Sequence, residues 1–177
     1  MDLSNVTWPK QFQQLAQPLR NALRSVALRI DHIGSTSIPE LAAKPVIDIQ
    51  ISVANLEPLD TYRLPLERLG YIFRADNPIR TQRYFRETPG NPRVHIHVVR
   101  AGSFGEQFAL LFRDYMRVHP NVATQYAELK IGLAQRYQLA EERPLYTEAK
   151  RPFIWKVIAQ ADDWAQSTGW FPGPSDA

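Results

Sequence analysis

Residues 31–50 read DHIGSTSIPELAAKPVIDIQ, and this stretch decides the fold that we expect. It contains a Gly-Ser-Thr-Ser turn, residues 34–37, directly after an apolar run. It closes with Asp48 inside a second apolar run, residues 46–53, whose β-branched residues predict a buried strand. Two residues after Asp48 comes Gln50, on the same face of that strand. The stretch therefore joins a turn suited to phosphate to a strand with a single acid.

The turn is the first candidate binding element. A glycine between a strand and a helix lets backbone amides approach an anion, and neighbouring hydroxyls can donate hydrogen bonds to phosphate oxygens. Gly34, Ser35 and Thr36 are therefore candidate phosphate ligands. The alternative is an ordinary turn in which Ser37 caps a short helix, since Glu40 follows at capping-box spacing. We expect that helix to reach about residue 43.

Asp48 is the candidate catalytic and metal-binding acid. A carboxylate among apolar neighbours must be paired, hydrogen-bonded or bound to a cation, because burying it bare costs on the order of several kcal/mol. Oxygen ligands on a rigid strand suit the divalent ions Mg²⁺ and Mn²⁺ that accompany nucleoside triphosphates. The alternative is a structural salt bridge with Lys44 or Arg83.

The rest of the chain predicts a mixed fold. A first helix is expected over residues 10–25, where Pro18 should kink it or divide it into two. Apolar runs bounded by turn residues predict further strands, at 26–33, 71–74, 83–86 and 94–99, the last two as a hairpin. Apolar stripes at helical spacing predict helices over 56–69 and from about residues 104, 120 and 153.

The fold class that follows is α/β (α+β), with a mixed β-sheet flanked by helices and a helical C-terminal half. The 177 residues fit a single domain, 1–177, in which the Gly- and Pro-rich residues 167–177 are expected to form a loose tail.

Composition narrows the function classes. A net charge of +3 suits an anionic small molecule and does not by itself argue for nucleic acid. The absence of cysteine excludes disulfides, zinc–thiolate sites and thiol catalysis. The first ten residues, MDLSNVTWPK, do not resemble a signal peptide, and no apolar run approaches the roughly 20 residues of a membrane span. We therefore expect a cytoplasmic protein without a membrane partner.

His95 and His97 share one face of their predicted strand. Two histidines at this spacing can share a metal or bind phosphate when protonated, and the alternative is a polar face turned to solvent. With Asp48 on a neighbouring strand, a mixed metal site with transition-metal preferences becomes possible.

Charged and aromatic residues of the helical half form a second group of candidates. Arg113 could clamp a phosphate or pair with Asp48, and Asp114 could supply the missing carboxylate. Lys44 and Lys150 are further candidates for binding phosphate, and Lys130 and Arg151 are additional cations of the helical half. For the cations on helices, the alternative is a helix face exposed to solvent. The aromatic residues Phe108, Phe112, Tyr126 and Phe153 fit a core better than a base-stacking surface.

Several longer stretches together resemble one family. The text HIGSTSIPELAAKPVIDI is similar to the hallmark of the GrpB family (UPF0157), a member of the nucleotidyltransferase superfamily. So are VHIHVV, LLFRDYMRVHPNVATQYAELK and YTEAKRPFI, and these blocks run from about residue 30 to residue 158.

The resemblance implies a nucleotidyltransferase-like fold in which Gly34 and Ser35 hold nucleotide phosphates and Asp48 binds a divalent metal. The superfamily pattern has a second acid where this chain has Gln50, and a third acid on a strand where this chain offers His95 and His97. Glu40 also departs from the glycine typical of GrpB relatives. Relatives fused to dephospho-coenzyme A kinase imply a nucleotide or coenzyme A context.

Three hypotheses follow. The first is metal-dependent nucleotidyl or phosphoryl transfer from a nucleoside triphosphate to an unidentified acceptor. The second is a non-catalytic module that binds a nucleotide or coenzyme A. The third is a metal-dependent hydrolase built on Asp48, His95 and His97.

Overall fold

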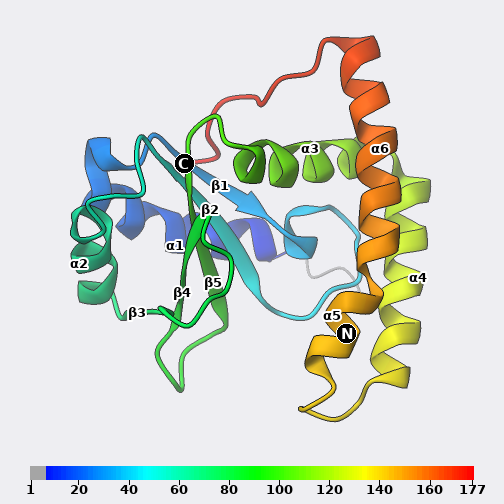
Figure 1. Cartoon of the computed structure of the whole chain (residues 1–177), viewed down its shortest axis with the longest axis horizontal. Helices are drawn as coiled ribbons and strands as arrows, with labels where there is room; N and C mark the ends of the chain where they lie inside the picture. The colour runs from blue at the N-terminus through cyan, green and yellow to red at the C-terminus, as the bar shows by residue number, and fades with distance from the viewer. Residues whose placement is uncertain (1–6) are drawn as a thin grey trace.

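The computed structural model describes residues 7–177 (Figure 1). The first six residues, on which the expectation about a signal peptide rests in part, lie outside the described residues. The strands are β1 (Arg29–Ile33), β2 (Ile47–Val53), β3 (Tyr71–Phe73), β4 (Gln82–Glu87) and β5 (Val94–Arg100). The helices are α1 (Trp8–Leu23), α2 (Asp60–Arg68), α3 (Phe104–Val118), α4 (Pro120–Arg136), α5 (Arg143–Ala149) and α6 (Arg151–Thr168).

The strands form one mixed sheet in the order β1-β2-β5-β4-β3. Only β2 and β5 run parallel; the other neighbours are antiparallel, and β4 and β5 form the expected hairpin. The parallel register pairs Asp48 with His95 and Gln50 with His97. The prediction of a mixed sheet with a helical C-terminal half is confirmed, and the central pairing sets the candidate residues side by side.

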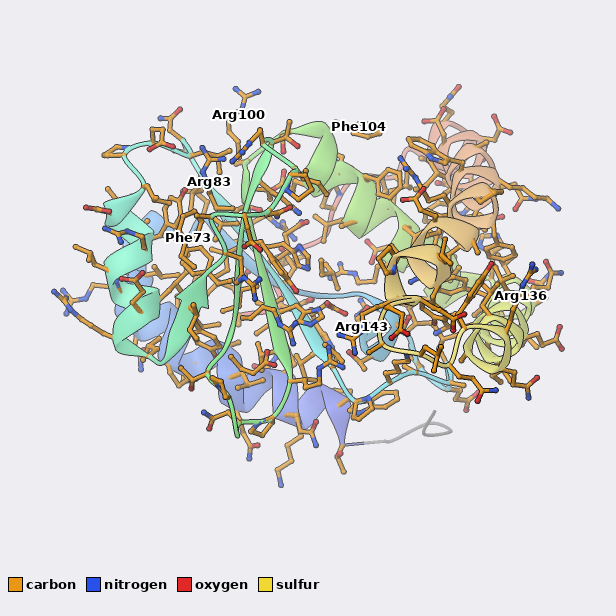
Figure 2. All side chains as sticks on the ribbon, turned by 60° about the horizontal axis from the view of Figure 1, so that its bottom comes forward. Phe73, Arg83, Arg100, Phe104, Arg136 and Arg143 are labelled. Carbon is orange, nitrogen blue, oxygen red and sulfur yellow. The ribbon has the colours of Figure 1, made fainter. Side chains whose placement is uncertain are left out.

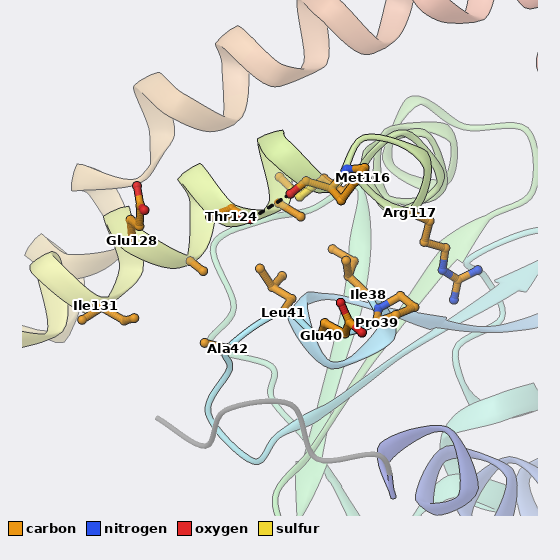
Figure 3. Close-up of a pocket in the computed structure, with 13 residues that line it drawn as sticks. Ile38, Pro39, Glu40, Leu41, Ala42, Met116, Arg117, Thr124, Glu128 and Ile131 are labelled. Atoms are coloured by element: carbon orange, nitrogen blue, oxygen red, sulfur yellow. Dashed lines mark hydrogen bonds between the residues drawn. The ribbon is translucent and has the colours of Figure 1, made fainter.

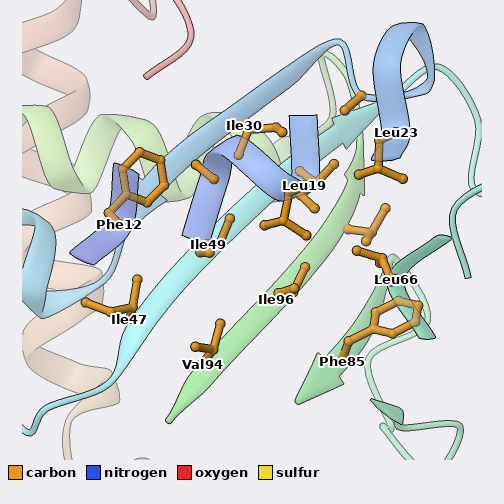
Figure 4. Packing of buried hydrophobic residues seen from close by; sticks show 14 of the residues in the cluster. Phe12, Leu19, Leu23, Ile30, Ile47, Ile49, Leu66, Phe85, Val94 and Ile96 are labelled. Carbon is orange, nitrogen blue, oxygen red and sulfur yellow. The ribbon is translucent and has the colours of Figure 1, made fainter. Parts of the chain in front are cut away.

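One face of the sheet carries the main core (Figure 4). Helix α1 buries Phe12, Ala16, Leu19 and Leu23, spaced so that they lie on one side of the helix. They pack against alternate residues of β2 and β5, including Ile49 and Ile96, which are fully buried. Because strand side chains alternate in direction, the residues between these, including Asp48 and His95, face the opposite side.

The other face is covered in part by the helical half of the chain. Helices α3, α4 and α6 share a second apolar cluster, with Tyr115, Met116, Tyr126 and Val157 among its buried members. Phe112 and Phe153 pack against this cluster, as expected for core aromatic residues.

One local prediction is wrong. Residues 37–43 do not form a capped helix: a 3₁₀ turn spans Ser35–Ser37, and Ser37 Oγ donates to the Gly34 carbonyl at 2.6 Å instead of capping. Glu40 then takes φ +59°, which a helix does not allow. The loop packs against α3 and α4 through Ile38 and Leu41, which point toward Met116 (Figure 3).

Two outcomes were expected at Pro18, a kink or a division into two helices; the division does not occur, because α1 is one continuous helix from Trp8 to Leu23. Pro18 stands on its exposed face, where water can satisfy the carbonyl that lacks an intrahelical donor.

The C-terminal segment is not the loose tail expected for residues 167–177. It returns from the end of α6 to the outer edge of β1 (Figure 1). There the Ala177 amide donates to the Ile30 carbonyl at 3.1 Å, and the Asp176 carboxylate accepts from the His32 amide at 2.9 Å. Asp176 also pairs with the buried Arg113 at 2.8 Å. Tertiary hydrogen bonds therefore order a segment whose composition alone favours disorder.

Among residues 7–177, no helix has both the length and the apolar character needed to cross a membrane.

Candidate functional site

The Gly34 turn rests directly on Asp48. Gly34 has φ +70°, a conformation that side chains disfavour. A Cβ atom at this position would lie 2.4 Å from Asp48 Oδ2, so only glycine allows the turn to approach the carboxylate this closely. The turn and the acid, separated by thirteen residues in the sequence, are thus one structural unit.

Hydroxyl groups hold the turn in place. Thr36 is buried, donates to the Val46 carbonyl at 3.0 Å and lies 3.0 Å from His32 Nε2. The Ser35 hydroxyl instead accepts from Lys130 Nζ at 3.0 Å. Thr36 therefore stabilises the turn, while Ser35 connects it to a cation of α4.

Asp48, His95 and His97 form a compact cluster. His95 Nδ1 lies 3.1 Å from Asp48 Oδ1, and His97 Nε2 lies 3.7 Å from the same oxygen. One ligand atom from each residue lies within 4.8 Å of the others, and no other group of three or more such residues is placed this way between residues 7 and 177. The alternative for Asp48 was a structural salt bridge with Lys44 or Arg83. Among residues 7–177 the ion-pair partners of Asp48 are His95 and His97, and Arg83 pairs with Glu57.

The ionised form of the Asp48 carboxyl group is favoured. Burial would raise the pKa of its carboxyl group, but hydrogen bonds and charge interactions with His95 and His97 outweigh burial and lower that pKa to about 2. About a quarter of each of the three side chains stays open to solvent. The cluster thus offers a carboxylate anion and two imidazoles to a ligand that enters from outside.

Neighbouring side chains orient the two imidazoles. His97 Nδ1 lies 3.3 Å from Gln82 Oε1, which leaves Nε2 directed toward Asp48. The Tyr84 ring packs beside both histidines, with centroids 5.6 Å from His95 and 5.1 Å from His97. His95 Nε2 is buried without a hydrogen-bond partner in the described chain. The contact of His97 Nδ1 with Gln82 is typical of imidazoles that bind metals, and His95 lacks the equivalent contact among the described residues.

A cleft of about 260 Å³ opens beside Asp48 and His95. We call it the cationic cleft, because five basic side chains line it: Lys44, Arg93, Lys130, Arg143 and Lys150. Ser35, Thr36 and Tyr146 also line it. Figure 2 labels Arg143, near the start of α5. Five cations around one carboxylate give the cleft a net positive charge that suits a polyanion.

Lys130 is the buried cation of this cleft. Its ammonium group donates to Ser35 Oγ at 3.0 Å and to the Ala42 carbonyl at 2.7 Å, and lies 4.7 Å from the Tyr126 ring centroid. Burial, with a smaller effect of Lys150, lowers its pKa to about 7. Burial also lowers the pKa of Lys150, which nearby Asp48 partly restores. Both ammonium groups would gain from an anion in the cleft.

A second cleft, of about 560 Å³, lies beside the His97 end of the cluster. His97 and Gln50 line it together with apolar and aromatic side chains, among them Ile79, Phe104, Phe108 and Trp155. We call it the aromatic cleft. Phe108 thus lines an open surface, whereas Phe112, Tyr126 and Phe153 belong to the helical core.

Sequence reasoning was wrong about the position of two residues. Arg113 is buried and paired with Asp114 at 2.7 Å and with Asp176 at 2.8 Å, near the β1 edge, and lines neither cleft. Asp114 is therefore occupied by Arg113 and does not join the cluster.

Other cleft residues were missed or undervalued. Lys130 follows Tyr126 by four residues on the buried side of α4, and a cation in that position was the available signal. Arg93, in the loop before β5, and Arg143, at the start of α5, gave no signal, whereas Tyr146 lay within the YTEAKRPFI stretch that resembles the family.

Comparison with known proteins establishes the family. The family model described as GrpB protein matches residues 2–160, and the chain belongs to the GrpB family. The UPF0157 protein YqkA of Bacillus subtilis is 39% identical over 163 residues, which are 92% of this chain and 47% of YqkA. A dephospho-CoA kinase of Mycolicibacterium paratuberculosis is 34% identical over 93% of this chain and 46% of that protein. The chain thus spans about half the length of these curated relatives.

Two solved structures show which known folds this chain is similar to. GrpB from Enterococcus faecalis matches with a TM-score of 0.81 and 35% identity, over 90% of this chain and 95% of that one. The Cid1 poly(U) polymerase, solved with MgGTP bound, matches with a TM-score of 0.54 and 16% identity, over 77% of this chain and 45% of that one. The fold is therefore similar to that of nucleotidyltransferases, as the sequence resemblance implied.

Proposed function

We propose that this chain binds a nucleoside triphosphate and transfers its nucleotidyl or phosphoryl group to an acceptor, with a divalent metal held by Asp48, His95 and His97. One observation carries the proposal: Ser35 and Thr36 of the Gly34 turn, Asp48 and His95 of the cluster, and five basic side chains line the same cleft. Lys44, Lys150 and Ser35, which Lys130 positions, would hold the phosphates.

The donor atoms bear on the identity of the metal. Mg²⁺ prefers oxygen ligands, yet two of the three donors here are imidazole nitrogens, and Gln50 stands where the superfamily has a second acid. Two imidazoles with one carboxylate suit a first-row transition ion, so we favour Mn²⁺ over Mg²⁺. When bound, such an ion would offset the negative charge of the phosphates.

The first prediction concerns Asp48. We expect ATP with Mn²⁺ at millimolar concentration to raise the melting temperature by at least about 2–4 °C, and Asp48→Asn to remove most of the Mn²⁺-dependent part. The reason is that the amide cannot supply the anionic ligand oxygen. Thermal unfolding with and without ATP, Mn²⁺ and Mg²⁺ measures both effects.

Asp163→Asn, an exposed change on α6, serves as the control and should keep the full shift. A wild-type protein that shows no shift with any nucleoside triphosphate and either ion would contradict the proposed function.

One alternative has its own support. Gln50 removes the second metal ligand of the usual two-metal mechanism, which favours a module that binds a nucleotide or coenzyme A without turnover. This alternative predicts stabilisation that survives EDTA, with no product from labelled ATP. A hydrolase at Asp48, His95 and His97 would instead require zinc, manganese or iron in the purified protein or activation on adding one of them.

The setting proposed for this activity is the cytoplasm, with a nucleotide as the small-molecule ligand and without nucleic acid or a membrane. The relatives named dephospho-CoA kinase support a functional link to coenzyme A metabolism.

A further inference from the structure

The aromatic cleft keeps large apolar side chains exposed next to the cluster. Phe104 is 70% exposed, Trp155 51% and Ile79 53%. Phe108 joins the two aromatic side chains, with ring centroids 5.5 Å from Phe104 and 5.5 Å from Trp155. Figure 2 shows Phe104 at the exposed start of α3. Apolar surface gathered around a cleft marks a binding site more often than scattered exposed residues do.

The two clefts lie on either side of the cluster. Asp48 and His95 line the cationic cleft, and His97 and Gln50 line the aromatic cleft. No lining residue is shared, and the consecutive residues Lys150 and Arg151 belong to one cleft each. A group held at the cluster would therefore be reachable from both clefts.

The chemistry of phosphoryl and nucleotidyl transfer assigns a role to each of the two clefts. In phosphoryl and nucleotidyl transfer the attacking oxygen and the leaving oxygen lie roughly in line on opposite sides of the phosphorus. The leaving group is pyrophosphate in nucleotidyl transfer and a nucleoside diphosphate in phosphoryl transfer, and under the proposed function the five basic side chains hold its phosphates in the cationic cleft. The attacking group must then approach from the aromatic cleft.

The lining of the aromatic cleft selects the kind of acceptor. Arg151 is the one lysine or arginine among the described residues that line it, and its guanidinium group is already paired with Glu148 at 2.9 Å. Polar atoms come from uncharged side chains such as Gln50, Gln82 and Thr81. A nucleic-acid strand needs repeated cationic contacts, which this cleft does not offer. A flat apolar ring suits the aromatic walls.

We propose that the aromatic cleft is the acceptor subsite, and that the acceptor is a small molecule with a flat ring system and a hydroxyl group. This inference rests on the proposed function. In the step, the acceptor hydroxyl oxygen forms a bond to the reacting phosphorus, and the bond from that phosphorus to the leaving phosphate oxygen breaks. The hydroxyl proton passes to water, and the leaving group, pyrophosphate or a nucleoside diphosphate, keeps the bonding electron pair.

The test uses the Trp155 side chain as a reporter in the ¹⁵N-labelled chain of 177 residues. The chain has four tryptophans, so the indole signals of Trp8, Trp164 and Trp170 serve as internal controls. The probe is 2-(2-naphthyl)ethanol, compared with a single-stranded RNA decamer. We expect the naphthyl alcohol to shift the Trp155 signal selectively and to bind equally well when ATP is saturating. We expect the RNA to leave the Trp155 signal in place.

A matched pair of variants tests the walls of the cleft. Phe104→Ala should weaken binding of the naphthyl alcohol by about fivefold through loss of a ring contact. Phe171→Ala removes a ring that is 79% exposed and outside the cleft, and should leave the affinity unchanged. Neither variant should change the thermal shift with ATP.

Three results would overturn the inference: no Trp155 shift with the naphthyl alcohol at millimolar concentration, displacement of the alcohol by ATP, or a selective Trp155 shift with RNA. Displacement by ATP would show that the cleft holds the donor. Failure of the proposed function looks different, because then ATP gives no stabilisation while the naphthyl alcohol still binds.

Discussion

At the scale of single residues, the site depends on the close approach of Gly34 to Asp48. Gly34→Ala would place a methyl group 2.4 Å from Asp48 Oδ2 at a backbone φ of +70°. We expect a loss of about 1–3 kcal/mol in the free energy of unfolding and loss of most of the Mn²⁺-dependent stabilisation by ATP. Urea unfolding and thermal shift measure the two effects.

Gly90→Ala is the control for backbone strain. Gly90 has φ +89°, but nothing lies within 4 Å of the position of its Cβ. This variant should show the strain cost alone and keep the ATP effect; equal behaviour of the two variants would contradict the role of the close approach.

Lys130 gives a second prediction at this scale. Its pKa is lowered to about 7 in the folded protein, and an anion in the cleft favours its charged form. Affinity for ATP should therefore fall as pH rises through 7, by about tenfold between pH 6.5 and 8.5. Calorimetric titration at several pH values measures this fall. Lys130→Met should bind ATP more weakly at low pH and lose the Lys130 part of the pH dependence, whereas Lys156→Met on the exposed side of α6 should keep it.

The same lowered pKa links Lys130 to folding. Between about pH 7 and the ordinary lysine pKa near 10.5, the unfolded chain binds the proton that the folded chain has released. The Lys130 contribution to the free energy of unfolding therefore rises with pH across this window. If the free energy of unfolding instead fell with pH across this window, and this fall were absent in Lys130→Met, the burial assigned to Lys130 would be contradicted.

At the scale of elements, helix α1 holds the sheet from the face opposite the site. Leu19 is fully buried against β2 and β5 in the main core. Leu19→Ala should cost about 2–5 kcal/mol in urea unfolding, because it removes apolar contacts and leaves a cavity. Gln14→Ala on the exposed side should stay within about 0.5 kcal/mol of wild type. A small loss for Leu19→Ala would show that α1 contributes little to the core.

The helices and strands also show how much of the fold could be predicted from the sequence pattern. The strands and the long helices were predictable, because hydrophobic periodicity follows directly from which side of each element is buried. The capped helix at residues 37–43 was wrong, since Ser37 satisfies the Gly34 carbonyl and Glu40 leaves the helical region. Helix α5 was not predicted; its seven residues bury none of their side chains fully, so they carry no apolar stripe.

At the scale of the whole molecule, the C-terminal segment joins β1 to the helical half. Asp176 accepts from the His32 amide and pairs with Arg113, whose side chain is only 4% exposed. Asp176→Ala leaves that guanidinium with one fewer partner, and we expect a loss of about 1–3 kcal/mol in the free energy of unfolding. The ATP-dependent thermal shift should not change, since Asp176 lines neither cleft. Unchanged stability would argue that the segment adds nothing to the fold.

The sequence by itself determined which segments form strands, the family resemblance and the association of the Gly34 turn with Asp48, because these depend on local patterns and on short motifs. It also indicated that Gln50, His95 and His97 depart from the usual acids. Only the tertiary structure decided which cations reach the phosphates: it buried Arg113 under the C-terminal segment and brought Lys130, Arg93 and Arg143 to the cleft. The physical reason is that these positions depend on how distant helices and loops pack on the sheet. Hydrophobic periodicity shows which side of an element is buried, but it does not show against which other element that side packs.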